Sequence, residues 1–133
     1  MILLLSLLNF DTPVEIFLKR CVEVQKMQSN RTVSIVQNCI LHELLMASRE
    51  YAKGKRETEE VSLVGIRDKY NLNDYTIHRN AQMLTRAGTR RSRGKGWIKS
   101  ANIKEAEKPN QNLRAILLSE SGRKIAEILF GRS

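Results

Sequence analysis

The stretch SLVGIRDKYNLNDYTIHRNAQMLTRAG, residues 62–88, decides the fold of this chain. A short segment with helical apolar spacing, 63–70, follows a capping serine, and residues 71–73 form a tight turn. The segment 74–87 then repeats the helical spacing and stops at Gly88, a residue suited to the left-handed position after a helix. Two helices joined by so short a turn form a helix-turn-helix arrangement.

The second of these expected helices has two chemically different faces. Ile77, Ala81 and Leu84 recur at helical spacing and form the apolar face. The opposite face has the chemistry to read DNA, because arginine pairs with guanine edges, glutamine with adenine, and tyrosine with a phosphate or a base methyl. Its residues are Tyr75, Arg79, Gln82 and Arg86, with Thr76 and His78 at the flanks. The alternative is an ordinary solvated helix face.

A strongly basic segment follows this helix. Its cations are Arg86, Arg90, Arg91, Arg93, Lys95 and Lys99, with no acidic residue between the first and the last. Trp97-Ile98 and the apolar run 113–118 both have strand character, so we expect the basic segment to be the loop of a β-hairpin. A cationic loop between two strands is suited to contact a phosphate backbone or a minor groove. The alternative is a charged hairpin that binds nothing.

Outside this centre the sequence predicts four further elements. A helix begins near Asp11-Thr12-Pro13 and ends near Met27, and a broadly apolar helix over 33–52 has the pattern of a buried central one. Residues 59–61 are a short strand candidate, and a last helix begins at Ser119 or Ser121 and continues through Phe130.

Composition limits the classes of function. The chain has 133 residues, 41% of them hydrophobic, which suits one ordinary domain. The net charge of +9 lies wholly in residues 67–133, which carry 15 basic and 6 acidic side chains. This asymmetry indicates a binding site for phosphates, anionic lipid or acidic protein. The apolar start, residues 1–8, is too short to span a bilayer and has no signal-peptide pattern, so we expect a cytoplasmic protein without a membrane partner.

No pattern for catalysis, a metal or a cofactor is visible in the sequence. Cys21 and Cys39 lie on apolar helix faces and are expected to be structural thiols, the alternative being a redox switch. His42 has no second metal ligand three or four positions away. Trp97 is expected to pack the hairpin against the body of the domain, and its alternative role is stacking on a base. We therefore expect a protein that is not an enzyme.

From Val33 to Phe130 the chain resembles a MarR-type winged helix-turn-helix regulator. Three stretches carry the likeness: 62–72, 76–88 and 113–123, the last with Ser119 in place of the family's usual threonine. The resemblance implies double-stranded DNA as the partner and a homodimer with its recognition helices in successive major grooves. It also implies DNA contacts from Arg79, Gln82 and Arg86 on the helix and from Arg90, Arg91, Arg93 and Lys95 on the wing.

The chain also departs from the family. It lacks the Asp-x-Arg wing signature, its stretch 94–112 is longer than a minimal wing, and it ends soon after the last helix. In this respect it is similar to the short SarA-like variants, so we expect residues 1–32, the apolar start and first helix, to carry dimerisation. Residues 33–133 then form the winged helix-turn-helix domain, a mainly α fold with a small β-hairpin wing. The alternative is that the apolar start folds back on its own core.

The sequence therefore predicts a homodimeric, sequence-specific transcription regulator that binds double-stranded DNA. One alternative is a winged-helix adaptor that binds an acidic protein or a polymerase subunit through the basic segment. Another is a replication or architectural protein that binds DNA with little sequence preference.

Overall fold

The structure, a computed structural model, describes residues 33–101 and 113–131, together with residues 12, 13, 15–17, 19, 20 and 24. These residues form a helix-rich domain with a small antiparallel sheet. Its elements are α3 (Ile35–Ala52), β1 (Val61–Ser62), α4 (Leu63–Lys69), α5 (Asp74–Leu84), β2 (Ile98–Ser100), β3 (Ala115–Leu118) and α6 (Glu120–Phe130). The expectation of a mainly helical domain with a small β component is confirmed. The expected apolar start, most of the first helix, Cys21 and the stretch 102–112 lie outside the described residues.

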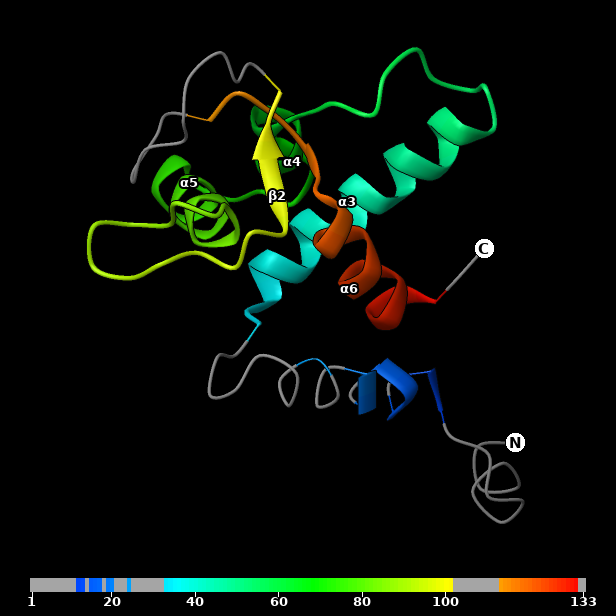
Figure 1. The fold of residues 1–133 in the computed structure, drawn as a ribbon, viewed down its shortest axis with the longest axis horizontal. Helices are drawn as coiled ribbons and strands as arrows, with labels where there is room; N and C mark the ends of the chain where they lie inside the picture. The colour runs from blue at the N-terminus through cyan, green and yellow to red at the C-terminus, as the bar shows by residue number, and fades with distance from the viewer. Residues whose placement is uncertain are drawn as a thin grey trace.

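Helix α3 is the central element, as its apolar pattern predicts. Its N-terminus is closed by a capping box, in which the Ser34 side chain accepts from the Gln37 backbone N–H and the Gln37 side chain accepts from the backbone N–H of Ser34. Figure 1 shows α3 crossing the molecule diagonally, with α4 and α5 on one side and α6 on the other. The buried residues of α3 include Ile40, Leu41, Leu44 and Leu45. Ile35 is 83% exposed because it lies at the very start of the helix.

Helices α4 and α5 follow each other closely, and each has a polar cap. Ser62 accepts from the backbone N–H of Gly65 at the start of α4, and Asn73 accepts from that of Thr76 at the start of α5. Between them Asn71 adopts a left-handed conformation with φ 54°, which asparagine tolerates. The apolar face of α5, formed by Ile77, Ala81 and Leu84, is fully buried as predicted.

The sheet has the strand order β1-β3-β2, and both pairings are antiparallel. The central strand is thus β3, which pairs Ile116 with Val61 of β1 and Leu118 with Ile98 of β2. Ser119 then caps α6 by accepting from the backbone N–H of Gly122. The first of the two candidate starting residues for this helix is therefore its N-cap.

The N-terminal segment contacts this domain at several of its described positions. Val24 is fully buried in the core, the rings of Phe17 and Phe130 stack with centroids 6.0 Å apart, and Arg20 donates to the carbonyl of Leu129. At these positions the segment packs on its own chain. Within the part of the chain that the structure describes, no helix is long and apolar enough to cross a membrane.

Candidate nucleic-acid interface

The face of α5 opposite its buried stripe presents polar side chains. Tyr75 is 72% exposed, Arg79 is exposed and Gln82 is half-buried. The helix is fixed from behind, where its apolar stripe packs against α3 and α4. These three side chains therefore project from a rigid support, as a surface for reading a groove requires.

The flanking residues of α5 are held by local contacts. The ring of His78 donates from Nδ1 to the carbonyl of Asp74 over 2.9 Å. Thr76 is half-buried, and its carbonyl accepts from the side chain of Asn80. Asn80 in turn accepts from the hydroxyl of Ser34 over 2.8 Å, which joins α5 to the start of α3. Thr76 and His78 thus lie at the edges of the exposed face, as predicted.

Helix α5 ends earlier than predicted, and this moves Arg86 off the helix. Its last residue is Leu84 rather than Ala87, because Thr85 is extended with ψ 161°. The Thr85 hydroxyl donates to the carbonyl of Gln82 and accepts from the backbone N–H of Gly88, which turns the chain away from the helix axis. Arg86 is exposed in the segment that follows and does not share the face of Arg79 by helical spacing.

The basic segment, residues 86–96, connects α5 to β2, and we call it the basic loop. The prediction that it joins two strands is wrong: the connection between β2 and β3 begins after Ser100. Figure 1 shows the basic loop as a yellow-green excursion beside α5. Four arginines on it are exposed: Arg86, Arg90, Arg91 and Arg93. The main cluster of positive charge is therefore a direct extension of α5.

The basic loop is tied to the C-terminal end of α5 by main-chain contacts. The backbone N–H groups of Lys95 and Trp97 donate to the carbonyls of Met83 and Leu84, at 3.1 and 2.9 Å. A Cβ added to Gly94 would lie 1.5 Å from the carbonyl oxygen of Thr85, so the two backbones touch directly. The loop thus supplies partners for carbonyl groups that a helix end leaves unpaired.

Lys95 faces the body of the domain, whereas the family resemblance implied a DNA contact there. Its Nζ donates to Oε1 of Gln37 over 2.9 Å and lies 5.0 Å from the centre of the Trp97 ring. Trp97 itself is 1% exposed, which confirms that it packs the segment against the body of the domain. Gln37 and Asn80, which the sequence did not single out, link α3 to α5 and to the basic loop, together with the Ser34 hydroxyl.

The electrostatic surroundings keep this region positive. No acidic residue occurs between Asp74 and Glu105. Arg67 forms an ion pair with Asp74 and a second with Asp68. Its hydrogen bond and positive charge lower the pKa of the Asp74 carboxyl. The acidic residue of α5 itself is therefore paired with a cation on α4.

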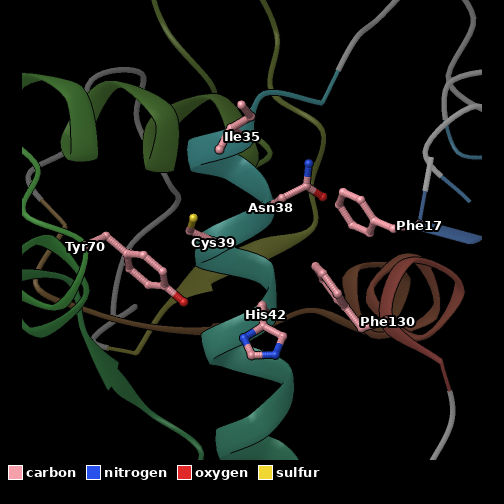
Figure 2. Close-up of a pocket in the computed structure, with 7 residues that line it drawn as sticks. All are labelled: Phe17, Ile35, Asn38, Cys39, His42, Tyr70 and Phe130. Carbon is pink, nitrogen blue, oxygen red and sulfur yellow. The ribbon is translucent and has the colours of Figure 1, made fainter. Parts of the chain in front are cut away.

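A pocket beside α3 is the second candidate site. It has a volume of about 250 Å³ and is lined by Phe17, Ile35, Asn38, Cys39, His42, Tyr70 and Phe130. Figure 2 shows Phe17 and Phe130 on one side of α3 and Tyr70 on the other. Oδ1 of Asn38 is buried without a hydrogen-bond partner. The lining is otherwise mostly aromatic and aliphatic, so the pocket offers packing rather than reactive groups.

A carboxylate beside this pocket organises its polar groups. Glu43 accepts from Lys69 over 2.7 Å, from the Tyr70 hydroxyl over 3.0 Å and from His42 over 3.2 Å. Burial alone would raise the pKa of the Glu43 carboxyl, but these three hydrogen bonds outweigh it and hold that pKa below its ordinary value. Burial and the bond to Glu43 raise the pKa of Tyr70 to about 12.

The thiol of Cys39 and the ring of His42 also line this pocket. Burial, followed by the negative charge of Glu43, raises the pKa of the half-buried Cys39 thiol, which disfavours the reactive thiolate. His42 contacts Glu43 and lies edge-on to the Phe130 ring, 5.1 Å away. Among the described residues, no three His, Cys, Asp or Glu side chains lie together in a way that could hold a metal ion.

Comparison of the chain with protein-family models, with curated proteins and with solved structures finds no match. The function is therefore inferred from the residues and the geometry of the chain itself.

Proposed function

We propose that this chain is a sequence-specific regulator that binds double-stranded DNA as a homodimer, with a winged helix-turn-helix fold. The observation that carries the proposal is the continuity of the exposed face of α5 with the four exposed arginines of the basic loop. The element order from α3 to β3 and the sheet order β1-β3-β2 support the winged-helix fold.

In this proposal α5 enters the major groove and reads bases. Arg79 and Gln82 have side chains that bond to guanine and adenine edges, and each good bidentate contact discriminates against a wrong base by about 1–3 kcal/mol. Tyr75, in the first turn of α5, has a hydroxyl for a phosphate and a ring for a thymine methyl.

The basic loop has a different task, which is to hold the phosphate backbone. Arginine binds phosphate bidentately, and each phosphate neutralised steepens the fall of log K with log salt by about 0.9. Because the loop follows α5 directly, its arginines would meet the backbone next to the groove that α5 occupies. Affinity and base selection then come from adjacent but separate residues.

Exposed apolar surface supports the homodimer. Ile35 is 83% exposed at the rim of the apolar pocket, and Ile16 is 38% exposed. Exposed large apolar side chains beside an apolar hollow mark a surface that a partner can cover. A second copy would add a second recognition helix, and two such helices bind half-sites about one helical turn apart.

The test is selection of bound duplexes from a random library at about 150 mM salt, where binding through phosphates alone is weakened. We expect an inverted-repeat motif. Arg79→Ala and Gln82→Ala are expected to relax the preference at one base position each, whereas Arg91→Ala weakens binding to every duplex and flattens the salt dependence.

Three outcomes would contradict the proposal in different ways. Retention of duplexes without an enriched motif would indicate a replication or architectural protein. Retention of no duplex would remove DNA as the partner of the basic loop and favour an acidic protein. A uniform loss of affinity in all three variants would mean that α5 does not read bases.

A further inference from the structure

We propose that Lys95 is a positioning residue, whose amine fixes the basic loop against α3 before any ligand is bound. The proposal rests on the proposed function only where it predicts effects on DNA affinity. Its central claim concerns the free protein, in which Lys95, Gln37 and Trp97 form one junction.

The buried amide of Gln37 is the core of this junction. The side chain is 1% exposed, and its Oε1 accepts from Lys95 over 2.9 Å and from the backbone N–H of Ser34 over 3.4 Å. Its Nε2 lies 3.4 Å from Oδ1 of Asn80 and 3.9 Å from the sulfur of Met83, both on α5. One side chain of α3 is thus bonded to α5 and to the basic loop.

Lys95 contributes the strongest of these bonds. A hydrogen bond from an ammonium group is roughly twice as strong as one between neutral groups, and 2.9 Å is a normal length for it. Without the lysine, Oε1 of Gln37 would keep only the long bond from Ser34, and a poorly satisfied buried acceptor is unfavourable. The Trp97 ring adds a favourable cation–π contact on the same amine.

The main chain at the same residue is anchored as well. The backbone N–H of Lys95 donates to the carbonyl of Met83, so both the main chain and the side chain hold this end of the loop. Arg90 and Arg91, in contrast, are exposed at the far part of the loop. We therefore assign Lys95 to holding the loop, and the exposed arginines to contact with the ligand.

A loop fixed in this way binds at a lower entropic cost. Ordering a mobile loop opposes association, and a loop that is already ordered avoids that cost. Loss of the Gln37–Lys95 bond would therefore weaken binding even though no atom that touches the ligand is removed.

The first measurement is limited trypsin cleavage of the free protein after Arg90 and Arg93, followed by mass spectrometry. Lys95→Met and Gln37→Met should each accelerate this cleavage about tenfold or more, since local opening becomes easier when a charge-assisted bond is lost. The double variant should be cleaved no faster than the single ones. Arg91→Met removes the same charge as Lys95→Met and should leave the rate at Arg93 near that of the wild type.

The second measurement uses Trp97, which is the single tryptophan of the chain. Lys95→Met should change its fluorescence emission, and Arg91→Met should not. Thermal unfolding of each variant, followed by circular dichroism, confirms that the fold is retained. If Gln37→Met does not fold, Lys95→Met alone decides, because its side chain is only half-buried.

Duplex affinity completes the cycle. If the double variant loses less affinity than the two single losses combined, Lys95 and Gln37 act together, which supports positioning. If the fold-losses of the single variants multiply in the double variant, Lys95 contacts a phosphate directly and the proposal is overturned. Unchanged cleavage in Lys95→Met would also overturn it. If the wild type binds no duplex while the cleavage results hold, the proposed function fails and the positioning role stands.

Discussion

Replacing Gly94 by alanine tests the close contact that shapes the basic loop. The added Cβ would lie 1.5 Å from the carbonyl oxygen and 2.7 Å from the carbonyl carbon of Thr85, and 3.0 Å from Cα of Gly88. All three are backbone atoms, which cannot rotate away as a side chain would. Carbon and oxygen without a bond approach to roughly 3.3 Å, so the two segments would have to separate by about 1.8 Å.

The cost of this separation follows from the bonds that it breaks. The bonds from Lys95 to Met83 and from Trp97 to Leu84 both bridge the gap. Each contributes about 1 kcal/mol net, and overpacking costs typically 1–3 kcal/mol. We therefore expect Gly94→Ala to lower the free energy of unfolding by about 3–5 kcal/mol and Tm by roughly 15 °C.

The assay is urea unfolding followed by circular dichroism, with Gly65→Ala as the matched control. Gly65 is exposed on α4, and a Cβ there would meet only the Ser62 side chain at 3.7 Å. Alanine is the better helix former, so this control should stabilise the protein by about 0.5–1 kcal/mol. A Gly94→Ala variant within 0.5 kcal/mol of the wild type would refute the contact between the two backbones.

Three further predictions concern a buried ring, a helix cap and a carboxylate. Trp97→Ala should cost about 3–5 kcal/mol, measured by urea unfolding, because the ring is 1% exposed; a cost below about 1 kcal/mol would contradict its burial. Ser62→Ala should cost about 1 kcal/mol in the same assay, and an equal stability would mean that its cap on α4 is not formed. Because the pKa of Glu43 is lowered in the folded protein, its ionised carboxylate stabilises the fold at pH values above the ordinary pKa of 4.5. This contribution is lost as the pH falls through the folded pKa. Glu43→Gln should therefore flatten the loss of stability between about pH 5 and pH 3, and an unchanged acid slope would contradict the role of Glu43.

The sequence was sufficient to predict the elements whose signals are local. Capping residues and apolar spacing predicted α4 and the start of α5, and the buried stripe Ile77, Ala81 and Leu84 is the predicted one. These features depend on residues within one or two helical turns of each other, so the local sequence pattern is enough to predict them. The central position of α3 followed for the same reason from its broad apolar surface.

The end of α5 could not be predicted in this way, because its causes come from elsewhere in the chain. Thr85 leaves the helix where Gly94 packs on its carbonyl and where Lys95 and Trp97 supply new donors. Gly88, whose φ is 68°, is the residue in the sequence that indicates a helix end, but it lies three residues after Thr85, where the chain leaves the helix. Because the predicted end of α5 was wrong, Arg86 was also wrongly predicted to lie on the helix.

The inward direction of the Lys95 side chain could not be predicted either, for a related reason. In the sequence it is one of several cations in a row, and nothing adjacent distinguishes it from Arg91 or Arg93. Its partner Gln37 lies 58 positions away, on a helix whose apolar pattern gave no reason to single out a glutamine. A charge pattern alone thus predicts where cations gather but not which of them face solvent.

The position of β3 at the centre of the sheet has a consequence for biosynthesis. Both outer strands precede it in the chain, and they pair with β3 rather than with each other. During translation the helices α3 to α5 therefore leave the ribosome well before the sheet can close, because residue 61 cannot pair until residue 116 has been synthesised. Until then β2 lacks its antiparallel partner strand, and the apolar side chain of Ile98 lacks the cover that β3 provides. A chain that stalls in this interval carries an open strand edge, the usual starting point of aggregation.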